Sequence, residues 1–307
     1  MPTSPRPPIG LIGLGIMGSA MSASLIQAGY EVIGYDVLAG RLRNHRKAGG
    51  QVAAGCRDVA KTADIIVCSL PSSEALLQTA AALLESTRPP KIVIETSTLP
   101  IAVKEKARRT FAARDTILLD CPLSGTGAQA RRKDLVVYAS GDRRAYRRVV
   151  PILEAFARAH YYVGAFGAGS NMKLVANLLV AIHNVAAAEA LVLAMKAGLD
   201  PKMVLKAIGD GAGSSRMFQV RGPLMVKGRY LPAHMKSEIY QKDIGIIRSF
   251  VRRLKCPTPL FGSSIPIYAT ALRQGWAKQD TAAIHAVLRQ RAGLRAKVPG
   301  RITRKRK

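Results

Sequence analysis

An apolar run leads directly into a GxGxxG loop near the amino terminus, in the segment Ile9-Gly10-Leu11-Ile12-Gly13-Leu14-Gly15-Ile16-Met17-Gly18. Gly13 permits a tight turn from strand to helix, Gly15 lets the backbone approach a pyrophosphate, and Gly18 lets the new helix pack closely on a sheet. The phosphates would face unpaired N–H groups at the helix amino terminus. The predicted dinucleotide-binding residues are Gly13, Leu14, Gly15, Ile16, Met17 and Gly18.

A single loop of this kind is weak evidence, because glycine-rich turns join strands to helices in many proteins. The following sequence strengthens it: residues 19–28 have helical character, Gly29 is placed to end that helix, and the next apolar run stops at Asp36. Asp36 lies about twenty positions beyond the loop, where a carboxylate accepts hydrogen bonds from the adenosine ribose and favours NAD. Arg41 and Arg43 follow closely; they are either ordinary surface charges or partners for the 2′-phosphate of NADP. We expect NAD, with NADP possible.

Length and composition indicate a soluble globular protein with more than one domain: 307 residues with 48% hydrophobic side chains. No apolar run reaches the length of a membrane span, and residues 1–8 lack the pattern of a secretory signal, so we expect a cytoplasmic protein without a membrane partner. The four cysteines form no CxxC pair, so we expect reduced thiols and no metal site.

The formal net charge of +28 indicates either attraction for anionic partners or the composition of a host that uses much arginine. Basic residues are spread along the chain and concentrate in residues 294–307, which we expect to form a flexible tail. Zinc-finger spacing, an RNA-recognition motif and an aromatic-rich basic strand are all missing from the sequence. We therefore expect no dedicated nucleic-acid binding.

Strand and helix patterns alternate through the first half, which predicts an α/β fold with a doubly wound, mostly parallel sheet. The apolar runs are residues 65–70, 92–94, 117–119 and 135–138. Residues 170–197 then form a long segment rich in Ala, Leu and Val, which predicts a buried interdomain helix leading into an all-helical domain. The predicted divisions are a Rossmann domain over 1–163, a helical substrate and dimerisation domain over 164–293, and the basic tail over 294–307.

Several separated motifs resemble the 3-hydroxyisobutyrate dehydrogenase group of β-hydroxyacid dehydrogenases, in the 6-phosphogluconate dehydrogenase superfamily. They are the GLGIMG loop, Glu95-Thr96-Ser97-Thr98, Asp120-Cys121-Pro122-Leu123-Ser124-Gly125, the segment from Gly167 through Lys173 to Asn177, and Lys242-Asp243. The resemblance covers about residues 9–288. It implies an NAD(P)-dependent oxidoreductase that transfers hydride between nicotinamide and a small hydroxy acid or its semialdehyde or keto acid. It also implies a homo-oligomer, either a dimer or a tetramer.

By this resemblance Lys173 is the catalytic acid/base. Oxidising an alcohol requires a proton to leave oxygen while hydride leaves carbon, and an amine aimed at that oxygen can accept the proton. A free lysine has a pKa of about 10.4, so burial or positive neighbours would have to lower the pKa for Lys173 to act as a base near neutrality. The alternative is a surface lysine whose stem covers apolar groups.

The resemblance also assigns a substrate-carboxylate loop to Ser124 and Gly125, and a substrate-binding amide to Asn177. Asn177 lies four residues after Lys173, which places both on one helix face. Thr126 stands where the family usually has a second glycine, so it either restricts the pocket or adds a hydroxyl contact. The identity of the carboxylate substrate therefore stays open.

The same resemblance places Lys242 and Asp243 near the nicotinamide, and Leu70, Pro71 and Thr98 along the cofactor's path. Each has a plain structural alternative, because Lys-Asp pairs are common on helices, proline ends strands and threonine caps helices.

Two alternative functions remain at the level of sequence. Imine reductases share this architecture and bind NADPH, and a non-catalytic, nucleic-acid-associated relative could use the basic tail. Both groups generally lack a lysine at the position of Lys173, so its presence favours the dehydrogenase.

Overall fold

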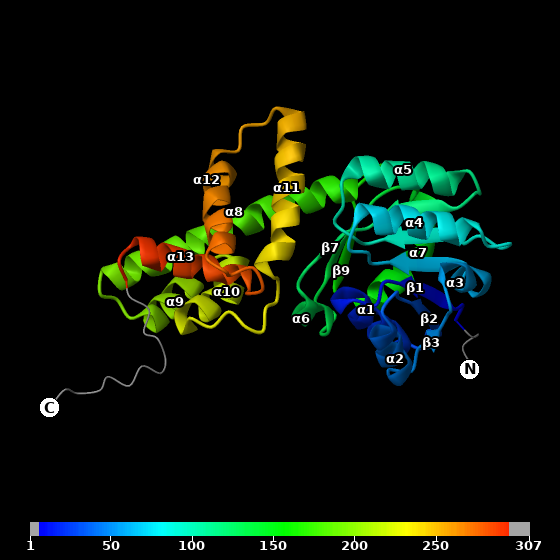
Figure 1. The fold of residues 1–307 in the computed structure, drawn as a ribbon, viewed down its shortest axis with the longest axis horizontal. Coiled ribbons are helices and arrows are strands. Elements are labelled where there is room, and N and C mark those ends of the chain that lie inside the picture. The colour runs from blue at the N-terminus through cyan, green and yellow to red at the C-terminus, as the bar shows by residue number, and fades with distance from the viewer. Residues whose placement is uncertain (1–5, 295–307) are drawn as a thin grey trace. The chain divides into compact units, whose positions relative to one another are not determined.

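A computed structural model describes residues 6–294 of the chain. The chain divides after Ala176 into two compact units. The first unit contains two β-sheets and their helices, and the second is helical (Figure 1). The helix that bears Lys173 begins in the first unit and continues into the second.

The first unit is built on a parallel six-stranded sheet in the order β3-β2-β1-β4-β5-β6. The order reverses between β1 and β4, which is the doubly wound arrangement that the sequence predicts. The strands are β1 (Ile9–Ile12), β2 (Val32–Tyr35), β3 (Gln51–Val52), β4 (Ile65–Cys68), β5 (Ile92–Glu95) and β6 (Ile117–Asp120).

Alternate residues of each strand enter separate cores on the two faces of this sheet. In β4, Ile65 and Val67 share a cluster with residues of α1 (Ile16–Gln27) and α7 (Arg143–Phe156). Ile66 and Cys68 join the opposite cluster, with residues of three other helices. Those helices are α3 (Cys56–Thr62), α4 (Ser73–Leu84) and α5 (Ile101–Ala112), while α2 (Ala39–Lys47) follows β2. Burial on both faces explains why the strands read as continuous apolar runs.

A small second sheet follows in the order β7-β8-β9, with β7 antiparallel and β9 parallel to β8. Its elements are β7 (Leu123–Ser124), α6 (Gly127–Ala130), β8 (Val136–Ala139) and β9 (Ala159–Tyr162). An isolated bridge pairs Asp120, the last residue of β6, with Ser140, the residue after β8. The two sheets therefore meet at Asp120.

The second unit contains most of α8 (Ala168–Lys196) and the helices that follow it. Asn184 of α8 is buried and donates hydrogen bonds to the Tyr268 hydroxyl and to the Thr281 carbonyl. Burial raises the pKa of Tyr268 to about 12, so this hydroxyl remains protonated. The remaining helices are α9 (Pro201–Asp210), α10 (Arg216–Lys227), α11 (Ser237–Leu254), α12 (Pro259–Arg273), η1 (Thr281–Ala283) and α13 (Ile284–Arg291).

The expectation that no apolar run reaches the length of a membrane span is wrong for α8. This helix has 29 residues and a window of mean hydropathy 1.9, so by length and composition it could cross a membrane. Buried polar contacts such as those of Asn184 fit a core helix equally well. The predicted domain boundaries remain predictions, and the proposed basic tail, apart from Leu294, lies outside the described residues.

Candidate functional site

The three glycines of the loop have different surroundings. A Cβ atom on Gly13 would collide with the Ser69 carbonyl, and one on Gly18 would collide with the Gly13 carbonyl. Gly13 also has a φ of +91°, which disfavours any other residue. By contrast, the nearest group to a Cβ on Gly15 would be the Arg41 guanidinium at 3.9 Å. Packing therefore explains Gly13 and Gly18 but not Gly15, whose approach to a cofactor's pyrophosphate stays a prediction.

Helix α1 begins at Ile16, three residues earlier than the predicted helix, because the loop leads straight into it. Its N-cap residue, Gly15, provides no side chain to accept hydrogen bonds from the first turn. Those N–H groups and the helix dipole favour an anion. The prediction for the other end is confirmed by Gly29, which has a φ of +83° just after the helix.

Asp36 follows β2 and is 5% exposed. Its carboxylate accepts hydrogen bonds from the Leu14 N–H at 2.8 Å and the Leu38 N–H at 2.9 Å. An Arg41 Nη atom lies 3.1 Å from the same carboxylate. Asp36 therefore shapes the glycine loop, and it presents its carboxylate together with an arginine rather than alone.

The predicted cofactor-lining residues Leu70, Pro71 and Thr98 follow β4 and β5, at the same carboxyl edge of the sheet as the glycine loop. The Leu70 N–H donates to the Ser97 hydroxyl at 2.8 Å, and the Ser97 N–H donates to the Glu95 carboxylate at 2.9 Å. These bonds tie the two loops together.

The predicted substrate loop follows β6. Gly125 has a φ of +140°, and a Cβ there would press on the Leu135 side chain. Thr126 is the N-cap of α6: its hydroxyl accepts from the Gln129 N–H, and the Gln129 side chain accepts from the Thr126 N–H. The departure from the family's second glycine thus has a structural explanation, a capping box.

Lys173 and Asn177 lie one turn apart on α8, as the spacing predicts. Lys173 is half-buried and Asn177 is buried. The Asn177 side-chain amide donates to Asp243 at 3.0 Å, and the Tyr240 hydroxyl donates to the Asn177 carbonyl at 2.8 Å. The link between Asp243 and Asn177 joins two motifs 66 residues apart and has no local signal in the sequence. Lys242 extends its Nζ to 3.8 Å from Asp243.

Comparison with known proteins identifies the family. Residues 8–164 match the family model described as the NAD binding domain of 6-phosphogluconate dehydrogenase, and residues 167–288 match that of the NAD-binding region of NADP-dependent 3-hydroxyisobutyrate dehydrogenase. An L-threonate dehydrogenase of Cupriavidus necator is 33% identical over 280 residues, which cover 90% of this chain and 94% of that protein. The chain belongs to the 3-hydroxyisobutyrate dehydrogenase family. The predicted family, enzyme class and NAD(P) cofactor are thereby confirmed.

Two further proteins similar to this dehydrogenase are named 3-hydroxyisobutyrate dehydrogenase. The mitochondrial 3-hydroxyisobutyrate dehydrogenase of Rattus norvegicus is 28% identical over 294 residues, which cover 93% of this chain and 88% of that protein. The Mycobacterium tuberculosis 3-hydroxyisobutyrate dehydrogenase solved with L-serine is 27% identical, with a TM-score of 0.84 over 92% of this chain and 99% of that one. An imine reductase from Pseudomonas sp. has 17% identity and a TM-score of 0.59, which shows a shared fold alone.

The dehydrogenase also contains a buried charged cluster that sequence reasoning missed. Lys104 of α5 extends its Nζ to 2.8 Å from Asp120 and 2.5 Å from Glu95, and all three side chains are 0% exposed. Burial alone would lower the pKa of Lys104, but the two carboxylates outweigh it and the pKa rises, so the lysine stays charged. We call these three residues the Glu95–Lys104–Asp120 triad.

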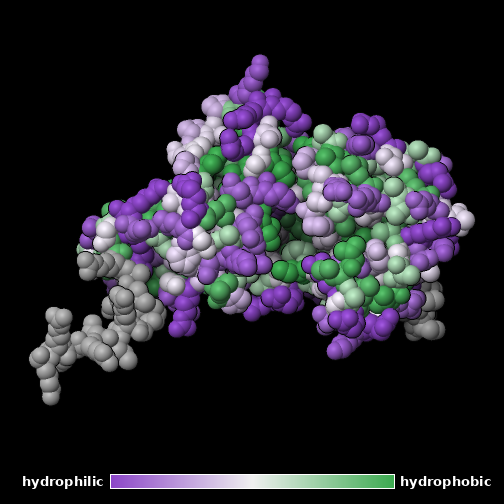
Figure 2. Space-filling model, viewed as in Figure 1, coloured by the Kyte–Doolittle hydropathy of each residue, from purple (hydrophilic) through white to green (hydrophobic). Residues whose placement is uncertain are grey.

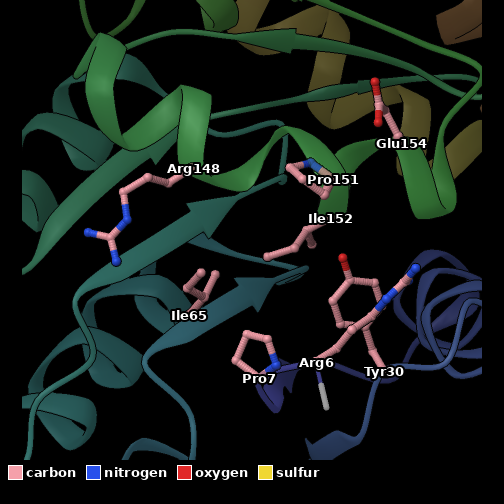
Figure 3. Close-up of a pocket in the computed structure, with 8 residues that line it drawn as sticks. All are labelled: Arg6, Pro7, Tyr30, Ile65, Arg148, Pro151, Ile152 and Glu154. Atoms are coloured by element: carbon pink, nitrogen blue, oxygen red, sulfur yellow. The ribbon is translucent and has the colours of Figure 1, made fainter. Parts of the chain in front are cut away.

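A pocket of about 470 Å³ lies elsewhere on the first unit, at the amino edge of the sheet (Figure 3). Arg6 and Tyr30 stand on one side of it, with Ile65 and Arg148 on the other. Arg6, Tyr30 and Ile65 lie before or at the starts of β1, β2 and β4, whereas the glycine loop follows the end of β1. This pocket is therefore separate from the candidate site. Its lining is completed by Pro7, Pro151, Ile152 and Glu154.

Proposed function

We propose that this dehydrogenase acts on a small polyhydroxylated acid of the threonate type, with Lys173 as the group that moves the proton. The proposal for the substrate is supported by relatives of 30% identity or more that are L-threonate dehydrogenases. The proposal for the lysine is supported by one observation above all: Lys173 lies one helical turn before Asn177, whose side chain and carbonyl are both held by α11.

In the oxidative direction the alcohol loses a hydride from carbon and a proton from oxygen. A bound nicotinamide would supply the acceptor for that hydride. The Lys173 amine accepts the hydroxyl proton and becomes an ammonium, which stabilises negative charge developing on that oxygen. In the reductive direction the ammonium returns the proton to the carbonyl oxygen.

The substrate's carboxylate is assigned to Ser124 and Gly125. Ser124 is half-buried on β7, and no residue of the described chain forms a hydrogen bond with its hydroxyl. Because the Thr126 hydroxyl already accepts a hydrogen bond from the Gln129 N–H, we assign this hydroxyl to capping α6 rather than to binding the substrate. Lys242 and Asp243 stay predicted cofactor residues, with Asp243 also orienting Asn177.

We also propose a homo-oligomer located in the cytoplasm. Hydrophobic residues lie among hydrophilic ones on the visible surface (Figure 2). On α8, Val175, Leu179 and Leu193 are 50%, 46% and 71% exposed. A second copy of the chain would cover such residues. Sedimentation equilibrium of the full chain tests this: a concentration-independent monomer would contradict it.

The catalytic proposal is tested by replacing Lys173 with alanine and following nicotinamide absorbance with L-threonate, 3-hydroxyisobutyrate and both cofactors. We expect kcat/KM to fall by roughly 10²–10⁴-fold, the range for loss of a general acid/base. Lys196→Ala removes an exposed lysine from the same helix and should leave kcat/KM unchanged. Unchanged turnover of Lys173→Ala would overturn the role of Lys173, and turnover of 3-hydroxyisobutyrate but not L-threonate would overturn the substrate.

A further inference from the structure

We propose that Asp120 and Ser170 are positioning residues for the reaction: together they fix the first turn of α8, and thereby Lys173, to the end of β6. This inference rests on the proposed role of Lys173. It assigns a function to the Glu95–Lys104–Asp120 triad, to which the sequence analysis gave none.

The contact between Asp120 and the helix is direct. The Ser170 N–H donates to one Asp120 carboxylate oxygen at 2.7 Å, and the Ser170 hydroxyl donates to the other at 2.8 Å. Residues 120 and 170 are 50 positions apart, so the helix is capped from a strand end rather than from its own N-cap. First-turn N–H groups lack partners within their helix, so an ionised carboxylate there both satisfies a donor and complements the dipole.

A second pair of contacts holds the preceding residue. The Gly169 N–H donates to the Ser140 hydroxyl at 2.9 Å, and that hydroxyl lies 3.2 Å from the Asp120 carboxylate. A Cβ atom on Gly169 would collide with the carbonyl oxygens of Tyr138 and Asp120. The helix start is therefore pressed against the strand ends with no room to slide toward them.

Lys104 maintains this cap. Two carboxylates, Glu95 and Asp120, reach the same ammonium, so the triad carries one net negative charge in a fully buried place. Without the ammonium the carboxylates would repel, and one would take up a proton. A protonated Asp120 would be a weaker acceptor for the Ser170 N–H than the charged form.

The triad also reaches the cofactor side of the site. The other carboxylate oxygen of Glu95 accepts from the Ser97 N–H, and the Ser97 hydroxyl accepts from the Leu70 N–H. Leu70 is a predicted cofactor-lining residue, while Lys173 follows Ser170 by three positions. The triad thus fixes both Lys173 and the loop that contains Leu70 to β5 and β6. Catalysis is sensitive to such placement, because a misplacement of about 1 Å can cost 10²-fold in rate.

The test compares Ser170→Ala with Thr116→Val. Thr116 is an equally buried hydroxyl of the same unit, and it donates one bond to the Pro90 carbonyl at 2.6 Å, before β6 rather than after it. We expect Ser170→Ala to lower kcat by about tenfold, because the helix start loosens. The affinity for reduced cofactor, measured by fluorescence titration, should stay within about twofold, and Thr116→Val should leave kcat unchanged. Ser170→Thr, which keeps the hydroxyl, should recover most of the kcat lost in Ser170→Ala.

Asp120→Asn provides a second variant. Removing the negative charge that accepts from the Ser170 N–H should lower kcat, because the cap on the helix start is weakened. If Ser170→Ala keeps the normal kcat, or loses no more kcat than Thr116→Val does, the inference is wrong. These outcomes separate from failure of the proposed function: full activity in Lys173→Ala removes both, whereas an inactive Lys173→Ala beside a fully active Ser170→Ala removes the positioning role alone.

Discussion

Each edge of the six-stranded sheet carries a group of three charged side chains, and the two groups differ in how far they are buried. At the carboxyl edge, Lys104 lies between Glu95 and Asp120, and all three side chains are 0% exposed. At the amino edge, Asp64 precedes β4 and pairs with Arg88 and Lys91, with side-chain exposures of 30%, 63% and 60%. The same kind of chemistry is thus buried at one end of these strands and hydrated at the other.

This difference indicates what each group is for. Exposed ion pairs contribute little to stability and cost little to form. Buried ones cost several kcal/mol of desolvation per ion, so an apolar cluster of equal volume would often serve stability as well. The costly group lies beside the start of α8, at the carboxyl edge of the sheet, where parallel α/β sheets bind ligands. Its location favours a role in holding geometry over a role in stability alone.

The largest effect expected from this comparison is on Lys104→Met. Leaving two buried carboxylates without their ammonium should lower the free energy of unfolding by about 3–5 kcal/mol. Urea unfolding followed by circular dichroism measures this change. The triple variant Glu95→Gln, Lys104→Met, Asp120→Asn removes all three charges and should recover part of the loss. A loss below about 1 kcal/mol in Lys104→Met would mean that the triad behaves like a surface pair.

A buried histidine offers the next effect. His285 is 1% exposed, and burial, followed by the nearby Arg289 charge, lowers its pKa from 6.5 to about 4. Folding therefore favours the neutral ring, and this contribution is present above about pH 6.5 and lost as the pH falls toward 4. The loss should approach on the order of 3 kcal/mol in strong acid. Thermal unfolding between pH 7 and 4 measures it, with His285→Gln as the variant whose stability should depend less on pH. Equal slopes for both proteins would contradict the assignment.

The sequence predicts the half of this structure that is encoded locally. The strands β1, β4, β5 and β6 are apolar runs because both faces of the sheet are covered. The two-residue strands β3 and β7 are too short to show any periodicity, and β9 is Ala-His-Tyr-Tyr, which lacks an apolar run.

The site divides in the same way. The glycine loop, Lys173 and Asn177 are visible as spacings within single segments. The triad is invisible, since the helix containing Lys104 is rich in charge and reads as a surface helix. Its burial depends on Glu95 and Asp120, which come from two other strands. The Asn177 contact with Asp243 is missed for the same reason, because the partners are distant in sequence.

A smaller effect is expected at Arg41, the charge of the carboxyl edge that stays 45% exposed. Its guanidinium pairs with Asp36 and lies nearest to Gly15, so it is placed to meet a 2′-phosphate while Asp36 meets a ribose hydroxyl. Arg41→Ala should shift the ratio of kcat/KM values toward NAD over NADP by about tenfold, which corresponds to the loss of about one charge-assisted hydrogen bond. Arg46→Ala, which removes another exposed arginine of α2, is the control. An unchanged ratio in Arg41→Ala would leave Asp36 alone as the determinant.

The smallest effect belongs to the amino edge. Hydrogen bonding from Lys91, with the charges of Arg88 and Lys91, lowers the pKa of Asp64, so its contribution is present above pH 4 and lost as the pH falls further. Because these side chains are hydrated, Asp64→Asn should cost about 0–1 kcal/mol. Salt distinguishes the two edges: about 1 M NaCl shortens the Debye length to roughly 3 Å and should remove the difference between Asp64→Asn and the native chain. The Lys104→Met deficit should persist in the same salt, because ions do not enter the buried triad. If salt removed both deficits, the two edges would be equally hydrated and the contrast between them would fail.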